Sequence, residues 1–223
     1  GMYEGRPTQT INAGNVENKG FETSLSYRKS LTKQFNFDIG GNFTYVKNEV
    51  VNLGDSGTFF DSKPHSGPAG SQKPCRTVVG QPIASFYGLK TDGIYNSWEE
   101  VNNGPKMNSN VQPGDYKYVD VNGDGVINTD DMVFIGSPLP KFTYGFYLSG
   151  NYSFIDFNLA FQASYGNQIY NMTRAYIDAN GMYNYSTRRL NAWTESNHTS
   201  EPRQSIGTNN YDMQSDAYIE NGS

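Results

Sequence analysis

Residues 120–131 carry oxygen-bearing groups at a spacing that suits a calcium ion. Loop positions 1, 3, 5, 9 and 12 are Asp or Asn, and position 7 offers a backbone carbonyl: Asp120, Asn122, Asp124, Val126, Asn128 and Asp131. Gly125 stands at position 6, where the chain must turn sharply and a Cβ would clash. Because calcium takes oxygen ligands that converge on one point, the sequence predicts a Ca²⁺ site.

Two features bear on the strength and role of this site. Asp131 holds the last position, where a longer Glu is usual, so its bidentate reach is shorter. The alternative is an Asx-rich turn that holds no metal. Apolar residues 132–135 follow directly, so we expect the loop to pin a surface segment onto a strand. A calcium ion in this loop would be structural rather than catalytic.

No pattern of residues points to catalysis. The paired carboxylates, Glu99 with Glu100 and Asp130 with Asp131, are adjacent in sequence, and adjacent side chains in a strand or loop point apart. A glycosidase needs two carboxyl groups about 5–10 Å apart across the scissile bond. We therefore predict that the chain is not an enzyme and rank a calcium-stabilised glycosidase last.

Aromatic residues in the polar segments could contact a ligand. Rings beside Asn and Asp can stack on the apolar faces of sugars, and the candidates are Tyr95, Trp98 and Trp193. The alternative for each ring is that it packs the small core of a folded loop.

The composition favours strands and turns and argues against some partners. The 223 residues include 17 Tyr, 13 Phe and 24 Gly, a mixture that builds strands broken by turns. The net charge is −5 and no basic patch stands out, so we expect no nucleic-acid partner. The single Cys75 can form no internal disulfide. No apolar run approaches the ~18 residues that a membrane helix needs.

Alternation of apolar and polar residues marks two pairs of strands. Apart from Thr23, Gly41 and Gly150, apolar residues hold the odd positions of 21–27 and 35–45, the even positions of 142–152 and the odd positions of 155–165. A polar turn over 29–34 joins the first pair, and a tight connection through Ser153 and Phe154 joins the second, so we expect two long antiparallel hairpins. The connections at the other end of the hairpins are long.

Short turns at one end and long loops at the other are the layout of an outer-membrane β-barrel. Aromatic residues near the strand ends suit the interfacial girdle of such a barrel: Tyr27, Phe35, Tyr45, Phe142, Tyr152 and Tyr165. The apolar faces carry no charge in these segments, and we expect Ile39 and Leu159 to face lipid at mid-bilayer. The alternative is a sandwich of the same hairpins, which would make the chain a soluble calcium-dependent carbohydrate-binding β module.

These patterns divide the chain into four parts. Residues 1–52 form the first barrel hairpin and residues 142–166 the second. Residues 53–141 form a long extracellular loop segment that contains the calcium-type loop 120–131, and residues 167–223 form a further extracellular segment. Because four strands cannot close a barrel, we expect the chain to be a piece of a longer protein.

Several sequence motifs occur in order along the chain. They are NAGNVENKGFE (12–22), GNFTYVKNEV (41–50), GQPIASFYG (80–88) leading to DGIY (92–95), PGDYKYVDVNGDGVIN (113–128), GSPLPKFTYG (136–145), YGNQIY (165–170), and WTESN (193–197) leading to Pro202 and Arg203. Together they resemble the SusC/RagA family of TonB-dependent outer-membrane transporters, in particular the C-terminal part of the barrel. The resemblance covers nearly the whole chain.

The resemblance implies an all-β fold, with antiparallel hairpins from a roughly 22-stranded outer-membrane β-barrel that has long extracellular loops. It implies a location in the bacterial cell outer membrane and a surface SusD-like lipoprotein that lids the barrel. It also implies nutrient uptake, including polysaccharide utilisation, by import of glycans, oligosaccharides or peptides. The TonB complex would drive the import through an N-terminal region that this chain lacks. The calcium loop carries over onto the six oxygen-bearing positions named above.

Overall fold

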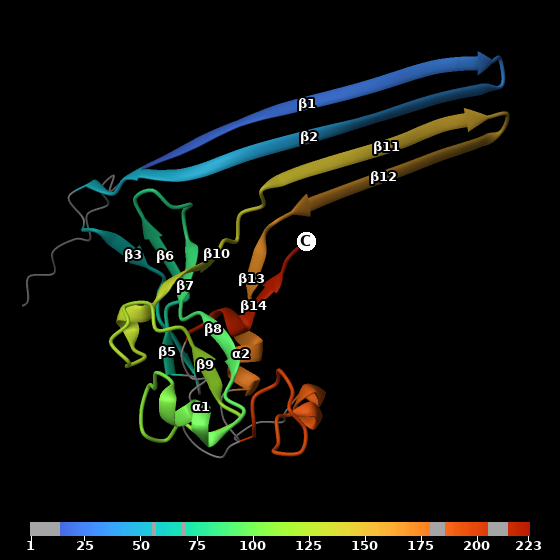
Figure 1. The fold of residues 1–223 in the computed structure, drawn as a ribbon. Coiled ribbons are helices and arrows are strands. Elements are labelled where there is room, and N and C mark those ends of the chain that lie inside the picture. The colour runs from blue at the N-terminus through green and yellow to red at the C-terminus, as the bar shows by residue number, and fades with distance from the viewer. Residues whose placement is uncertain (1–13, 55–56, 68–69, 179–185, 205–213) are drawn as a thin grey trace, which may run out of the picture.

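The computed structural model describes residues 14–54, 57–67, 70–178, 186–204 and 214–223. Most named elements are β-strands, and the ladders between them are antiparallel. A long four-stranded sheet projects from a loop body of short strands and helices (Figure 1). The expected all-β class is confirmed. Within the described residues the long sheet is open, and the closed barrel stays a prediction.

The long sheet has the strand order β1-β2-β11-β12. The bounds are β1 Asn15–Thr32, β2 Phe35–Asn52, β11 Phe142–Tyr152 and β12 Ile155–Tyr165. Both expected hairpins are present, each closed by a tight turn, and Ser153 in the second turn has a φ of 56°. The strands β1 and β2 run further than the alternation indicated, because their polar ends beyond the apolar segment also pair.

The register of the sheet places the alternating apolar residues of all four strands on one face. One level is aromatic on every strand, and its members pair in the order Phe21, Tyr45, Phe142 and Tyr165. The next levels are Thr23, Phe43, Tyr144 and Ala163; then Leu25, Gly41, Phe146 and Phe161; then Tyr27, Ile39, Leu148 and Leu159. Because successive residues point to opposite faces, the other face takes the intervening polar residues.

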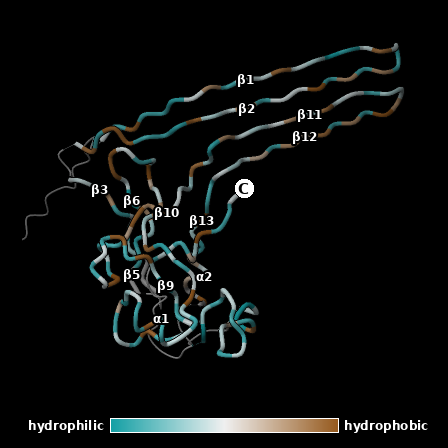
Figure 2. The backbone as a smooth tube through the Cα atoms, viewed as in Figure 1, coloured by the Kyte–Doolittle hydropathy of each residue, from teal (hydrophilic) through white to brown (hydrophobic). Residues whose placement is uncertain are grey.

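Within the described residues, neither face of the long sheet is covered by a second layer. Every residue of β1 is exposed, and on β12 the side chains of Leu159 and Phe161 are 50% and 64% exposed. Hydrophobic and hydrophilic residues alternate along the four strands (Figure 2). A β-sandwich would bury one face against another sheet. The hairpins therefore do not form the sandwich that the soluble alternative requires.

The loop body contains short antiparallel ladders. One sheet has the order β10-β7-β6-β3, and three strand pairs join β8 to β9, β13 to β14, and β4 to β5. The bounds are β3 Phe59–Asp61, β4 His65–Gly67, β5 Gly70–Gln72, β6 Cys75–Val78, β7 Ser85–Gly88, β8 Thr91–Ile94, β9 Tyr116–Tyr118, β10 Val133–Gly136, β13 Gln168–Tyr170 and β14 Ile219–Asn221. The helices are α1 Trp98–Asn103 and α2 Met172–Asp178, with 3-10 turns at Thr129–Asp131, Thr187–Asn191 and Asp216–Tyr218. In the part of the chain that the structure describes, no helix is long and apolar enough to cross a membrane.

Three small apolar clusters hold the loop body together, and the cluster around Tyr170 joins segments that are far apart in sequence. The ring of Tyr170 lies 5.9 Å from that of Phe86 and 6.1 Å from that of Tyr218, measured between centroids. Leu89 donates its backbone N–H to the carbonyl of Gln214 at 2.9 Å. The two loop segments that the sequence separates therefore pack as one body.

The loop body is bonded to the end of β2 that lies away from the β1–β2 turn, which is called the upper end below. Val50 is fully buried, and its N–H donates to the carbonyl of Gln81 at 3.0 Å, while the N–H of Gly80 donates to the carbonyl of Val50 at 2.8 Å. The N–H of Ile83 donates to Oδ1 of Asn48 at 2.8 Å. Strand β11 pairs with β2 only up to Tyr45. Beyond that point, Gly80, Gln81 and Ile83 of the loop body bond to β2 instead.

Candidate functional site

The apolar face of the long sheet is the most extended candidate surface. At its upper level, Phe142 stacks on Tyr165 at 4.8 Å between ring centroids. At the turn end, Phe35 meets Tyr152 edge-on at 5.9 Å. Aromatic and aliphatic residues both lie between these two levels, among them Phe146 and Leu159, and Leu159 is half exposed there. An exposed apolar band between two aromatic rows is typical of a strand surface that faces lipid.

Between the level of Phe21 and the β1–β2 turn, one charged residue, Lys29, lies on the apolar face among the described residues. Lys29 pairs with Phe37, so it shares the side of the sheet that the sequence analysis expected to be free of charge up to position 27. It lies close to the β1–β2 turn, where a long side chain can reach water while its methylene stem covers apolar surface. The uncharged band therefore ends before the turn.

The opposite face of the sheet is polar and internally hydrogen-bonded. Nε and Nη2 of Arg28 donate to Oδ2 of Asp38 at 2.9 and 2.5 Å. The hydroxyl of Tyr147 donates to Oδ1 of the same carboxylate at 3.1 Å. Nδ2 of Asn36 donates to Oδ1 of Asn151 at 3.0 Å across β2 and β11. This face suits contact with water or with polar cargo and does not suit lipid.

Tyr147 lies across β2 at Gly40. A Cβ placed on Gly40 would stand 2.5 Å from Cε1 of Tyr147, closer than carbon atoms approach. The glycine therefore leaves the space that the ring fills, and the ring lies against the backbone while its hydroxyl reaches Asp38. The result is a fixed aromatic surface on the polar face.

The residues of the expected calcium loop fold as successive Asx turns. The carboxylate of Asp120 accepts the N–H groups of Gly123 and Gly125 at 2.7 and 2.8 Å. The φ of Gly125 is 82°, as its place in a sharp turn requires. In three further turns a side-chain Oδ1 accepts the backbone N–H of the residue two positions later. The acceptors are Asn122, Asp124 and Asn128, at 2.9, 2.8 and 2.7 Å respectively.

Asp131 closes the loop from inside. Its exposed fraction is 0%, Oδ1 accepts the N–H groups of Val121 and Asn122 at 2.9 and 3.4 Å, and Oδ2 accepts that of Asn128 at 2.9 Å. Burial acts to raise the pKa of Asp131, but these hydrogen bonds, with a further one from Asp120, hold its pKa below the ordinary value. The carboxylate therefore stays charged and organises the loop.

The chemistry of the donors fits calcium, although it does so through mixed ligands. Among the described residues, no three Asp, Glu, His or Cys side chains converge closely enough to hold a metal ion. A calcium ion would therefore need the amide oxygens of Asn122 and Asn128 and the carbonyl of Val126 beside the carboxylates. All of these donors are oxygens, which is the ligand type that calcium takes. The Ca²⁺ site stays a prediction.

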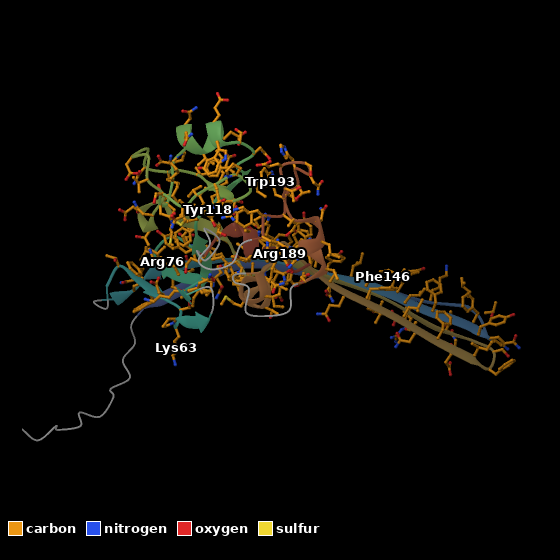
Figure 3. All side chains as sticks on the ribbon, turned by 90° about the horizontal axis from the view of Figure 1, so that it is seen from below. Lys63, Arg76, Tyr118, Phe146, Arg189 and Trp193 are labelled. Carbon is orange, nitrogen blue, oxygen red and sulfur yellow. The ribbon has the colours of Figure 1, made fainter. Side chains whose placement is uncertain are left out.

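The three candidate ligand-contact aromatics lie in different surroundings. Tyr95 is 2% exposed, and its hydroxyl donates to the carbonyl of Pro105 at 2.5 Å. Trp193 is 6% exposed, lies within the loop body (Figure 3), and donates from Nε1 to Oδ1 of Asn96 at 3.0 Å. These two rings therefore pack the core of the loop body and leave no free face for a ligand. Trp98, at the start of α1, is 57% exposed and remains available.

A stacked arginine in the loop body is a feature that the sequence analysis did not find. The guanidinium of Arg76, labelled in Figure 3, lies 3.9 Å from the ring centroid of Phe59 and 4.0 Å from that of Tyr87. It also donates to the carboxylate of Asp61 at 2.7 and 3.2 Å. The ring of Tyr87 meets Phe134 at 5.3 Å, so the stack ties β3, β6, β7 and β10 together. The pairings of β3 with β6, β6 with β7 and β7 with β10 bring these residues together, and no local motif signals them.

Comparison with known proteins shows which proteins have a similar sequence and fold. No protein-family model matches the chain. TonB-dependent receptor P3 of Formosa agariphila is 34% identical over 209 residues, which cover 92% of this chain and 20% of that receptor. TonB-dependent receptor SusC of Bacteroides thetaiotaomicron is 27% identical over 218 residues, which cover 96% of this chain and 20% of that receptor. The chain is a homologue of part of a SusC-type TonB-dependent receptor.

The family resemblance drawn from the motifs is thereby confirmed. TonB-dependent receptor P26 of Formosa agariphila is also 34% identical, over 218 residues that cover 97% of this chain and 22% of that receptor. The fold matches the RagAB peptide transporter with a TM-score of 0.71 and 22% identity, covering 97% of this chain and 22% of the other. The chain spans about a fifth of the length of the curated relatives it matches. These relatives are receptors and not enzymes, in agreement with the expectation from the sequence.

Proposed function

We propose that the chain forms part of the wall and the external loops of a TonB-dependent outer-membrane transporter. The observation that carries the proposal is the register of the long sheet, which gathers the apolar residues of four strands on one face and the polar residues on the other. Lipid would cover the apolar face, and the polar face would line the interior of the barrel. The open edges of β1 and β12 would pair with further strands in a barrel of roughly 22 strands.

The height of the sheet supports a bilayer span. The strands β11 and β12 have 11 residues each. Such strands extend over about 36 Å at about 3.3 Å per residue. At a tilt of about 45° this length crosses about 25 Å, the height of the apolar band in an outer-membrane barrel. The upper ends of β1 and β2 would stand above the membrane and carry the loop body.

The proposed setting is the bacterial outer membrane, and the proposed partners are a SusD-like surface lipoprotein and the TonB complex. The proposed cargo is a glycan, an oligosaccharide or a peptide. The names of the relatives support this, since they include SusC and a peptide transporter, RagAB. The geometry adds an exposed Trp98 on α1, at the end of the loop body away from the long sheet (Figure 1), where a lid protein would meet it.

A spin-label experiment on the full receptor tests the orientation of the sheet. Single cysteines replace Leu148 and its neighbour Ser149 in turn, in a background where Cys75 is Ser, and each variant is labelled in lipid vesicles. We expect the label at 148 to be accessible to oxygen and the label at 149 to a water-soluble nickel chelate, because the two side chains face opposite sides. Equal accessibility of both labels, or the reverse pattern, would refute the proposal.

We also propose that the 120–131 loop binds Ca²⁺ as a structural ion. Its support is the Asx-turn geometry, which draws five Asp and Asn side chains around a glycine turn. Calorimetric titration of the purified receptor with calcium tests it, and we expect Asp124→Ala to abolish this binding event. Asp156→Ala, on the long sheet, is the matched control and should leave it unchanged. Titration curves that do not differ between wild type and Asp124→Ala would refute the proposal that this loop binds Ca²⁺.

A further inference from the structure

The long sheet splits above its upper aromatic level, and the split forms a cavity of about 720 Å³. Strand β2 continues upward past Tyr45, whereas the segment before β11 turns away toward β10. The segment 80–83, which bonds to Val50, forms another wall of the cavity. The apolar part of the wall includes Tyr45, Val46, Pro82, Ile83, Phe134 and Leu139. Pockets of this size hold ligands with tens of atoms.

The cavity lies at the depth where lipid head groups would be, provided that the proposed function is right. Tyr45 belongs both to the aromatic level and to the cavity wall. Lys47 and Glu49 continue the same side-chain row and also line the cavity. They stand about 7 and 13 Å further along the strand. The head-group layer on each side of a bilayer is about 5–8 Å thick, so the lower part of the cavity falls within it.

The charges of the cavity favour an anion. Two lysines, Lys47 and Lys141, and one acid, Glu49, line it. Nζ of Lys47 lies 2.6 Å from the carboxylate of Glu49, so these two charges compensate each other. No ion pair within the described part of the chain involves Lys141. Among its described lining residues, the cavity therefore keeps one positive charge that no ion pair compensates.

Lys141 is held in place at the mouth of this cavity. Its backbone N–H donates to the carbonyl of Tyr165 at 2.8 Å. The stem of its side chain lies over Gly166, where an added Cβ would come within 2.8 Å of Cγ of Lys141, and the φ of Gly166 is 85°. A glycine that adopts this backbone conformation thus makes room for the lysine stem.

We propose that this cavity binds one anionic lipid of the surrounding leaflet. Its phosphate would contact Lys141, and the first methylenes of its acyl chains would lie against the apolar wall. The lipid-facing surface just below would contact the acyl chains, and Lys141, which makes no ion pair with another described residue, would contact the phosphate above. The proposal rests on the orientation of the sheet in the proposed function.

Native mass spectrometry of the full receptor in detergent tests the proposal. Phosphatidylglycerol and phosphatidylcholine are added at equal concentration, and the lipid that remains bound is counted. We expect preferential retention of phosphatidylglycerol, and a fall of about fivefold for Lys141→Gln, the usual effect of one lysine at an anionic membrane surface. Lys33→Gln, in the turn at the opposite end of β1, is the matched control and should change nothing.

Three results would overturn the proposal. They are equal retention of the two lipids, unchanged retention by Lys141→Gln, and displacement of the lipid by millimolar inorganic phosphate, which would make the cavity an ion site. The spin-label experiment separates this failure from failure of the proposed function. A receptor whose sheet is oriented as proposed but shows no lipid preference refutes the lipid site alone.

Discussion

Replacement of Leu159 by Arg is the sharpest test of which face of the sheet meets lipid. Leu159 pairs with Leu148 at the level shared by Tyr27 and Ile39, midway between the two aromatic rows. An arginine on a lipid-facing strand at the bilayer midplane costs about 2–4 kcal/mol. At 1.4 kcal/mol per tenfold change, the folding equilibrium in the membrane should fall by roughly 30- to 700-fold. Ile39→Arg, on the same level, should behave alike.

The assay is a urea titration of the full receptor refolded into lipid vesicles, scored by the band shift of folded barrels on gels. The matched control is Asn158→Arg, one residue earlier and on the polar face. We expect that control to shift the free energy of unfolding by less than about 1 kcal/mol, since its guanidinium stays in water. Equal destabilisation by both variants would show that the two faces meet similar surroundings. No loss from Leu159→Arg would remove that residue from the lipid surface, and either result would refute the reasoning.

Three further predictions concern the polar face and the loop body. Gly40→Val should cost about 1–3 kcal/mol, because its Cβ meets Tyr147, and Tyr147→Ala in the same chain should relieve much of this loss; additive urea shifts would contradict the contact. Trp193→Phe removes the hydrogen bond to Asn96 and should cost about 1 kcal/mol, seen as faster proteolysis of the loop body. Because the pKa of Asp131 lies below its ordinary 3.8, its carboxylate stabilises the loop above that pH, and the stabilisation is lost as pH falls through the folded pKa. Hydrogen exchange of the 120–131 loop, corrected for its intrinsic pH dependence, should rise below that pH, and a flat profile would argue against the role of Asp131.

The alternation of apolar residues predicts the register of each hairpin as well as the two faces of the sheet. In the first hairpin the apolar positions are odd on both strands, yet the tight turn pairs Thr32 with Phe35, an even position with an odd one. One extra residue is needed to bring the apolar rows together, and the structure has a register shift between Ser30 and Thr32. In the second hairpin the apolar positions are even on one strand and odd on the other. There Tyr152 pairs directly with Ile155 and the register has no shift. Each hairpin thus carries the information for its own register.

The contacts of the loop body could not be predicted in the same way. Its strands are three or four residues long, too short to show a period. Tyr95 and Trp193 therefore look from the sequence like any exposed ring in a loop rich in Gly and Asn, although tertiary packing buries both. The Asx turns of the calcium-type loop are different, because Asp and Asn bond to N–H groups two or three residues away. The sequence therefore predicts hydrogen bonds between residues close in the chain, such as the Asx turns, and does not predict contacts between residues far apart in it.

The pairing of β2 with β11 shows why the loop body must be folded for the sheet to form. Tyr45 and Phe142 pair although about 100 residues separate them, and closing a flexible loop of that length costs about 4 kcal/mol beyond a constant term. Cross-strand pairs contribute about 0.2–1 kcal/mol each. At the lower end of that range the 11 pairs between these strands supply about 2 kcal/mol, which does not offset the closure cost. Shorter closures reduce it: Val50 bonds to Gln81, and β7 pairs with β10, which ends a few residues before β11 begins. The loop body thereby delivers β11 to the edge of β2 at the aromatic level, so the wall and the external structure of this segment depend on each other.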